Sequence, residues 1–149
     1  MDNRPTWHEY FMQMAYLAAK RSTCLRRAVG AALVRDNQLI STGYNGSPKN
    51  SPHCAEVGCL REQQNVPSGQ KHELCRGVHA EQNAIIQAAI NGSSTRNSVL
   101  YCTHQPCSIC ARLIINAEIR EVYIANAYPD DLAEQLFREA GIGMYYIDL

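Results

Sequence analysis

Two short motifs contain the side chains with the clearest potential for chemistry in this sequence. Residues 79–81 read His-Ala-Glu, and residues 106–110 read Pro-Cys-Ser-Ile-Cys. One imidazole and two thiolates bind zinc tetrahedrally and leave the fourth position to water, which is the arrangement of a catalytic site. On a helix, Cys107 and Cys110 share one face, and the positive end of a helix favours the thiolate form. We therefore predict a zinc site with His79, Cys107 and Cys110 as ligands.

Glu81 is the remaining functional group of the first motif and is not needed as a ligand. In the first turn of a helix, His79 and Glu81 can both project off the helix end toward one metal and its water. Zinc lowers the pKa of a bound water from about 16 to about 7, and Glu81 is placed to take up that proton and return it to a substrate. A Cys-x-x-Cys alone favours a redox motif or half of a structural zinc site. The two motifs together favour catalytic zinc.

The composition is that of an ordinary globular protein and limits the kinds of partner that the chain can be expected to bind. The 149 residues fit one domain, with 46% hydrophobic and 19% charged residues. The formal net charge is zero, so the chain lacks the basic field of a nucleic-acid-binding protein, and a small substrate suits it better. Residues 1–4 carry charges, so we expect no signal peptide, and no apolar run approaches the length of a membrane span. We expect a cytoplasmic protein with neither nucleic-acid nor membrane partners.

Hydrophobic periodicity and capping signals predict strands that alternate with helices after an opening hairpin. Thr6 and Glu9 form a capping-box pattern, and Asn91-Gly92 is a helix-ending pair. The predicted helices span residues 6–21, 79–91, 107–117 and 130–141. The predicted strands span residues 29–34, 38–42, 98–103, 121–125 and 144–147. This order predicts an α/β protein with a mixed sheet covered on both faces.

Residues 45–77 are mostly polar and show little periodicity. A loop of this length inside a compact domain is usually functional or held by a specific contact. The chain has seven cysteines, an odd number that argues against a simple disulfide framework. In a reducing compartment, clustered cysteines and histidines indicate metal binding. The loop concentrates such residues, namely His53, Cys54, Cys59, His72 and Cys75.

With these motifs identified, the sequence resembles the deoxycytidylate (dCMP) deaminases of the cytidine deaminase superfamily over nearly its whole length. The zinc motifs are similar to the signature of zinc deaminases that act on nucleobases. Residues 43–46, Gly-Tyr-Asn-Gly, and the long loop after them indicate the dCMP branch in its bacterial and phage form. Further matching stretches are residues 22–24, 29–31, 79–85, 101–103 and 106–110.

This resemblance implies a three-layer cytidine-deaminase-like fold, with a mixed five-stranded sheet and helices on both faces. Residues 1–149 would form one domain with an insert at about 45–77. The implied reaction is the hydrolysis of dCMP to dUMP and ammonia, which supplies dUMP for thymidylate synthesis. His79, Cys107 and Cys110 would hold the zinc, and Glu81 would shuttle protons. Cys102 is interpreted as a buried core thiol.

The resemblance also implies binding and regulatory residues. Asn45 would hydrogen-bond the sugar, and Ala80 would contact the substrate. Arg26 and Arg27 precede a strand that leads to the site, and the planar fork of arginine suits phosphate. The alternative is that both side chains lie in solvent. Family members are commonly hexamers, activated by dCTP with Mg²⁺ and inhibited by dTTP. The expected effector residues are Gly43, Tyr44, Gly46 and Lys49, where the alternative is a simple Asn-Gly turn.

A second, structural zinc is a further expectation. In relatives from phages and bacteria, a bound zinc orders this loop. The matching positions suggest as ligands Cys24, Cys54, His72 and Cys75, with Cys59 or His53 as substitutes. Scattered free thiols are the alternative. Two rival functions remain open: another deaminase of the superfamily, acting on cytidine, tRNA adenosine or a pterin-like ring, and a noncatalytic zinc-binding regulatory protein.

Overall fold

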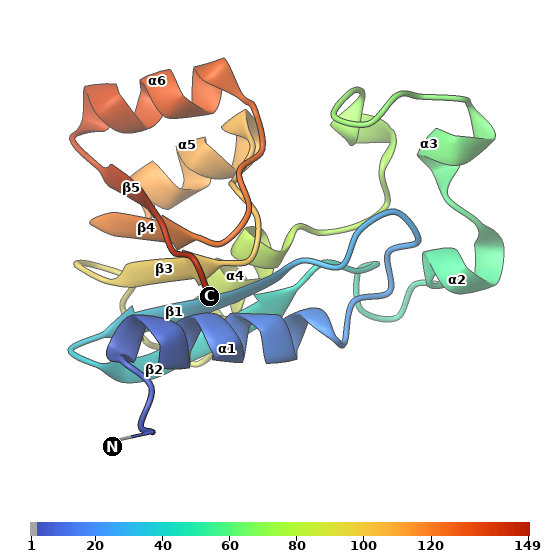
Figure 1. The fold of residues 1–149 in the computed structure, drawn as a ribbon. Helices are drawn as coiled ribbons and strands as arrows, with labels where there is room; N and C mark the ends of the chain where they lie inside the picture. The colour runs from blue at the N-terminus through green and yellow to red at the C-terminus, as the bar shows by residue number, and fades with distance from the viewer. Residues whose placement is uncertain (1–2) are drawn as a thin grey trace.

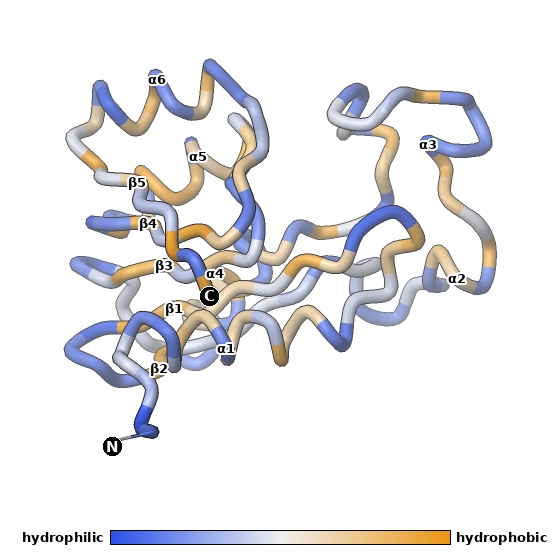
Figure 2. The backbone as a smooth tube through the Cα atoms, in the orientation of Figure 1, coloured by the Kyte–Doolittle hydropathy of each residue, from blue (hydrophilic) through white to orange (hydrophobic). Residues whose placement is uncertain are grey.

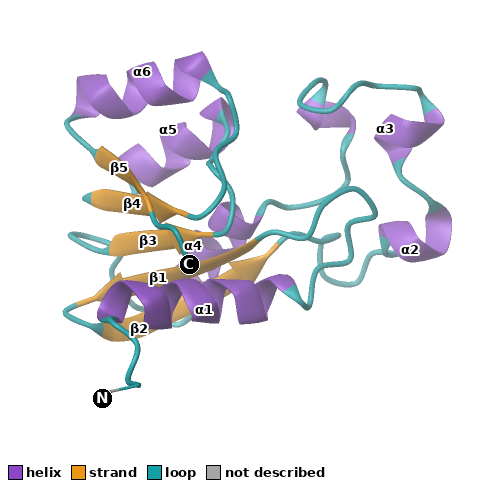
Figure 3. Cartoon of the chain, in the orientation of Figure 1, coloured by secondary structure: helices purple, strands orange, loops and turns teal. Residues whose placement is uncertain are grey.

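The computed structural model describes residues 3–149, apart from the side chain of His72, so Met1 and Asp2 of the charged N-terminus lie outside the described residues. A five-stranded sheet has the strand order β2-β1-β3-β4-β5. Strand β1 runs antiparallel to β2 and β3, whereas β3, β4 and β5 are parallel (Figure 3). The strand bounds are β1 Gly30–Arg35, β2 Gln38–Tyr44, β3 Val99–Cys102, β4 Glu121–Ile124 and β5 Gly143–Tyr146. The predicted mixed sheet is confirmed.

Helices cover both faces of this sheet (Figure 1). Alternation along β1 separates the two layers, because Ala31 and Leu33 pack into one core cluster and Ala32 and Val34 into the other. Helix α1 covers the second cluster, and the other long helices cover the first. Their bounds are α1 Trp7–Ala19, α4 Ala80–Ile90, α5 Ser108–Asn116 and α6 Asp131–Ala140. The three-layer arrangement is confirmed, and Figure 2 shows hydrophobic and hydrophilic residues alternating along α6, as expected of a helix with one buried side.

Local capping chemistry explains why these elements begin and end where they do. The Oγ1 of Thr6 accepts a hydrogen bond from Glu9 N at 3.1 Å, and Thr6 N donates to the Glu9 carboxylate at 2.8 Å, which completes the predicted capping box. Gly141 ends α6 in the left-handed conformation, with φ of 73°. Strand β2 runs two residues beyond the predicted Thr42, to Tyr44, because its pairing with β1 continues to that point.

The long loop at residues 45–77 is an insert with little regular structure, which projects away from the sheet in Figure 1. It contains two single-turn helices and one 3-10 turn: α2 Cys54–Val57, α3 Leu60–Gln63 and η1 His72–Leu74. Gly46 and Val78 pair through reciprocal backbone hydrogen bonds of 3.2 and 2.7 Å, which bring the two ends of the insert together beside His79. Within residues 3–149, no helix is long and apolar enough to cross a membrane.

Candidate active site

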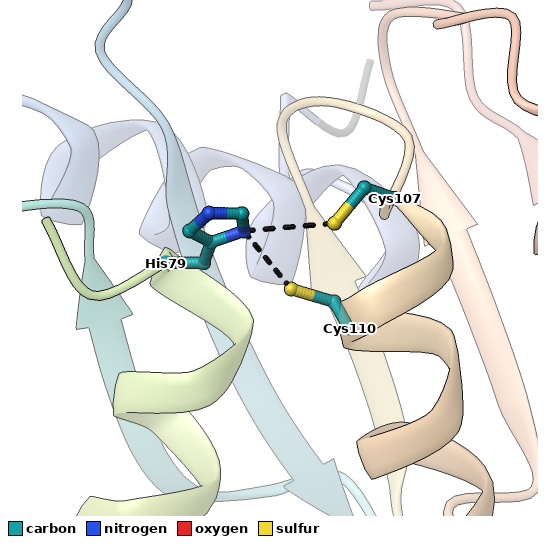
Figure 4. A group of neighbouring side chains, drawn as sticks. All are labelled: His79, Cys107 and Cys110. Carbon is teal, nitrogen blue, oxygen red and sulfur yellow. Dashed lines mark hydrogen bonds between the residues drawn. The ribbon is translucent and has the colours of Figure 1, made fainter. Parts of the chain in front are cut away.

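The two sequence motifs meet where α4 and α5 begin. His79 is the N-cap residue of α4, and Cys107 is the N-cap residue of α5. The backbone N–H of His79 donates to the side-chain oxygen of Gln82 at 2.8 Å, which fixes the start of α4. Figure 4 shows the imidazole of His79 directed at the sulfurs of Cys107 and Cys110 from the neighbouring helix.

The three side chains have the spacing of metal ligands. The Nδ1 atom of His79 lies 3.1 Å from the sulfur of Cys110 and 3.7 Å from that of Cys107. Tetrahedral zinc, with bonds of about 2.3 Å to sulfur and about 2.0 Å to nitrogen, separates its ligand atoms by roughly 3.5–3.8 Å. The donor atoms lie within 4.8 Å of one another, the only such group among the described residues. The predicted set is therefore brought together, and its donors and distances fit zinc.

The pKa values of the two thiols respond to each other. A hydrogen bond from Cys110, supported by one from His79, lowers the pKa of Cys107 to about 4. The neighbouring Cys107 sulfur, together with burial, raises the pKa of Cys110 above its ordinary value. Zinc binds cysteine in the thiolate form, so metal binding at this pair would release protons.

Glu81 lies in the first turn of α4, where its side chain is 5% exposed. Burial is the main cause that raises its pKa, and the charge of His79 opposes this rise. The carboxyl group lines the same cavity as His79 and Cys107 but is not part of the ligand set. Its position therefore suits proton exchange beside the metal. The predicted core thiol, Cys102, is fully buried, and burial raises its pKa well above the ordinary value.

A cavity of about 160 Å³ connects this site with the insert. Besides residues of the zinc motifs, it is lined by side chains from the loop after α1, the insert, the loop before α5 and the loop after β4. The lining residues that were not predicted from the sequence include Arg61, His104, Gln105 and Tyr128. His104 and Gln105 directly precede the Pro-Cys motif, so their place in the chain could have suggested them. No local signal identifies Arg61 or Tyr128.

Asn45 organises the wall of the cavity through its own side chain. Its Oδ1 accepts hydrogen bonds from Ser22 Oγ at 2.6 Å and from Val29 N at 2.9 Å, and its Nδ2 donates to Arg27 O at 2.7 Å. Because the amide nitrogen carries two hydrogens, one remains for a ligand in the cavity. Contact of Asn45 with a sugar stays a prediction.

The two predicted arginines both line the cavity but have different surroundings. The Nη2 atom of Arg26 donates to Val66 O at 2.6 Å, and its Nε lies 3.6 Å from the carboxylate of Glu62. The guanidinium of Arg27 lies over the ring of Tyr128, 4.9 Å from its centroid. Arg26 is thus tied to the insert, whereas Arg27 stacks on Tyr128 in the loop after β4.

The side chain of Thr103 connects His104 to the start of β1. Its Oγ1 accepts a hydrogen bond from Gly30 N at 3.1 Å and is hydrogen-bonded to His104 Nδ1 at 2.9 Å. Burial, and after it the charge of Arg27, lower the pKa of His104 and keep the ring uncharged.

The Gly-Tyr-Asn-Gly stretch is not a simple turn, because β2 continues to Tyr44 and Gly46 pairs with Val78. A Cβ atom on Gly43 would lie 2.2 Å from Ala80 O and 2.5 Å from Ala84 N. Glycine at this position therefore allows α4 to pack directly on β2. Lys49 and Tyr44 are exposed, and a regulatory role for them, Gly43 and Gly46 stays a prediction.

Three of the four residues expected to bind a second zinc line the active-site cavity, namely Cys24, Cys54 and Cys75. Backbone N–H groups point at two of the sulfurs, from Arg26 to Cys24 at 3.4 Å and from Gly77 to Cys75 at 3.3 Å. Burial raises the pKa of Cys54, and the nearby Cys24, Cys59 and Cys75 raise it further. The described side chains do not bring these sulfurs to the mutual spacing of metal ligands, and the side chain of His72 lies outside them.

Comparison with known proteins finds a matching family profile and several similar proteins. A sequence-family profile described as the cytidine and deoxycytidylate deaminase zinc-binding region matches residues 5–126. ComE operon protein 2 of Bacillus subtilis is 41% identical over 147 residues, which cover 98% of this chain and 74% of that protein. The deoxycytidylate deaminase of Schizosaccharomyces pombe is 41% identical over 140 residues, which cover 93% of this chain but only 43% of that protein.

Among solved structures, the dCMP deaminase of the cyanophage S-TIM5 in complex with dCMP and dUMP is similar to this fold. The TM-score is 0.81, with 27% sequence identity over 98% of this chain and 100% of that chain. The likeness therefore extends over the insert as well as the sheet and its helices.

Proposed function

This chain belongs to the cytidine and deoxycytidylate deaminase family, and from that membership we propose that it is a zinc-dependent enzyme that hydrolyses dCMP to dUMP and ammonia. The observation that carries the proposal is the group of His79, Cys107 and Cys110 at zinc-ligand spacing, with the buried carboxyl of Glu81 beside it. The names of the fission-yeast relative and of the cyanophage structure support dCMP as the substrate. The dUMP formed would supply thymidylate synthesis in the cytoplasm.

The protein side chains divide the work of the reaction between them. His79, Cys107 and Cys110 would hold zinc, which supplies a Lewis acid that makes water nucleophilic at neutral pH. Glu81 accepts a proton from the water that attacks C4 of cytosine and donates it to N3 of the ring. It then carries the second proton from the new C4 hydroxyl to the amino group, which leaves as ammonia.

The walls of the cavity supply contacts for the rest of the nucleotide. The remaining Nδ2 hydrogen of Asn45 suits a hydrogen bond to the sugar, and Ala80 lines the cavity beside Glu81. Arg26 and Arg27 add positive charge for a phosphate, because an arginine fork matches its oxygens. Contacts to the phosphate would let the enzyme select a nucleotide over the corresponding nucleoside.

The test is ammonia release from dCMP, cytidine and dCTP, compared side by side at equal protein and zinc concentrations. We expect a much larger kcat/KM for dCMP than for either alternative. Equal activity on cytidine would contradict recognition of the phosphate. A preference for adenosine in tRNA would contradict the proposal as a whole, although the net charge of zero argues against such a substrate.

We further propose a second zinc that holds structure, with Cys24, Cys54, His72 and Cys75 as its ligands and Cys59 or His53 as substitutes. Support comes from the three cysteines that line one cavity and from the backbone N–H groups directed at two of their sulfurs. Such hydrogen bonds stabilise thiolates, and a structural zinc contributes folding free energy directly. This zinc would order the insert at residues 45–77 within one catalytic domain.

Regulation by nucleotides is part of the same proposal. We propose that dCTP with Mg²⁺ activates the enzyme and that dTTP inhibits it, in a hexamer. The exposed Tyr44 ends β2 and the exposed Lys49 lies in the first part of the insert, while Gly43 packs against α4, which begins next to His79. An effector bound near Tyr44, Gly46 and Lys49 could therefore act on the start of α4.

A further inference from the structure

Unpaired buried polar atoms gather in the active-site cavity. Among residues 3–149, the buried side-chain nitrogen and oxygen atoms without a hydrogen-bond partner belong to Arg26, Ser47, Arg61, Arg76 and Gln105. All of these residues except Arg76 line the cavity that contains Glu81. A buried donor without a partner is unfavourable, because its hydrogen bonds to water are lost and not replaced. The presence of several such atoms in one cavity therefore indicates a polar ligand that forms hydrogen bonds with them.

Arg61 is the most deeply buried of these cations. It lies on α3 in the insert, and only 8% of its surface is exposed. Its Nη2 donates to Pro67 O at a long 3.4 Å, and its Nε has no partner. No carboxylate of the described residues lies within ion-pairing distance of it, and its charge acts on His79 in the zinc site. A buried guanidinium without a counter-ion requires an anion.

Arg26 adds a second charge at the same place. Its Nη2 donates to Val66 O at 2.6 Å, so that the consecutive carbonyls of Val66 and Pro67 hold the two guanidinium groups. The one carboxylate near them is Glu62, which lies 3.6 Å from Arg26 and is 50% exposed. Buried Arg61 and partly buried Arg26 thus have one carboxylate near them, and both line the cavity.

We infer that Arg61 is the principal anchor for the 5′-phosphate of the substrate and that it selects nucleotides over nucleosides. This inference rests on the proposed function and assigns the role to a residue of the insert. The planar fork of Arg61 can pair with two phosphate oxygens, and charge-assisted hydrogen bonds of this kind are the strong ones. Arg26 faces the same phosphate while it holds the turn at Val66 and Pro67. The insert is then part of the substrate site.

The test compares Arg61→Gln with wild type in kcat/KM for dCMP and for deoxycytidine, and in the binding of dUMP and deoxyuridine. We expect kcat/KM for dCMP and the affinity for dUMP to fall about 10- to 100-fold, with the values for both nucleosides unchanged. Arg61→Lys should recover part of the loss, because it retains the charge but lacks the fork. Arg76→Gln is the matched control, since Arg76 has the same unpaired Nε but lies outside the cavity lining. We expect it to leave the ratio of dCMP to deoxycytidine activity unchanged.

Two outcomes would overturn the inference. Equal losses on dCMP and deoxycytidine, with loss of one zinc per chain, would show that Arg61 only balances the charge of metal-bound cysteines. An unchanged ratio in Arg61→Gln, or in Arg61→Lys if the former does not fold, would show that another group binds the phosphate. In both cases wild-type protein would still convert dCMP. Failure of wild type itself to deaminate dCMP would instead contradict the proposed function.

Discussion

The four side chains of the zinc motifs divide into three that can hold a metal and one that can carry protons. His79, Cys107 and Cys110 lie at ligand spacing, whereas Glu81 is buried next to them and outside the set. A noncatalytic zinc site has no use for such a carboxylate, because burial of an acid without a ligand role is unfavourable. The position of Glu81 therefore favours a catalytic zinc site over a noncatalytic one.

Substitution of Glu81 by glutamine removes the proton carrier but preserves its size. We expect Glu81→Gln to bind the same amount of zinc and to lose about 10³-fold or more in kcat, because general acid–base catalysis contributes factors of this order. Turnover of dCMP and zinc per chain are the two measurements. The control is Glu134→Gln, which removes an acidic group from the first turn of α6. A variant at position 81 that stays active would contradict the proton-carrying role.

The residues of the zinc site could be predicted because their spacing is local. His79 and Cys107 each precede a helix, so the sequence pattern already determines which way their neighbours Glu81 and Cys110 point. The phosphate side of the cavity could not be predicted in the same way. Arg61 is one polar residue in an irregular insert, and the insert has no hydrophobic periodicity from which its burial could be predicted.

At the level of elements, the contact between β2 and α4 positions the start of the active-site helix. Gly43 allows this contact, since a Cβ atom would lie 2.2 Å from the Ala80 carbonyl oxygen. The hydroxyl of Ser41 donates to Ala84 O at 2.6 Å from the same side of the strand. A displacement of α4 would move His79 and Glu81 together.

We expect Gly43→Ala to lower the free energy of unfolding by about 3 kcal/mol, because the methyl group meets backbone that cannot move aside. Turnover should fall as well, since α4 carries Glu81. Urea denaturation of zinc-loaded protein measures the first effect. The exposed neighbour Thr42 gives the control, for which Thr42→Ala should change the stability by less than about 1 kcal/mol. Equal stability of wild type and Gly43→Ala would contradict close packing at this point.

The insert forms part of the cavity lining and contacts the loop after β4. A Cβ atom on Gly69 would lie 2.2 Å from the hydroxyl of Tyr128, so the outer turn of the insert touches the loop after β4. The insert has only short helical turns to order it, and a bound metal would supply the missing constraint.

Zinc analysis of the purified chain tests this account of the insert. We expect two zinc ions per chain in wild type and one in Cys54→Ser, with the thermal midpoint lowered because the insert loses its constraint. Cys59→Ser is a matched control, since Cys54 and Cys59 are equally buried at 6%. Two zinc ions in Cys59→Ser would support Cys54 as the ligand. One zinc ion in wild type would contradict a structural metal.

For the whole molecule, the sheet brings separate parts of the chain to one edge. The parallel strand β3 leads to Cys107, and β4 leads to the loop with Tyr128. This architecture was predictable, because strongly periodic helices with clear caps alternate with apolar strands. The arrangement of residues 45–77 beside the cavity was not predictable, since polar segments leave their tertiary contacts unspecified.

Nucleotide regulation is also a property of the whole molecule. We expect dCTP with Mg²⁺ to lower the KM for dCMP and dTTP to raise it, because each effector would favour a different state of a hexamer. Initial rates at low dCMP, with and without each triphosphate, measure this, and the mass of the particle in solution gives the number of chains. Rates that neither triphosphate changes would contradict the regulatory proposal but leave the catalytic one intact.

Zinc-dependent hydrolysis of dCMP is best tested by measuring dUMP and ammonia together as they form from dCMP. We predict equal molar yields from zinc-loaded protein, loss of both products after removal of zinc, and recovery when zinc is returned. Absence of dUMP with fully loaded protein would contradict the proposed reaction, and a yield that removal of zinc does not change would contradict its dependence on zinc.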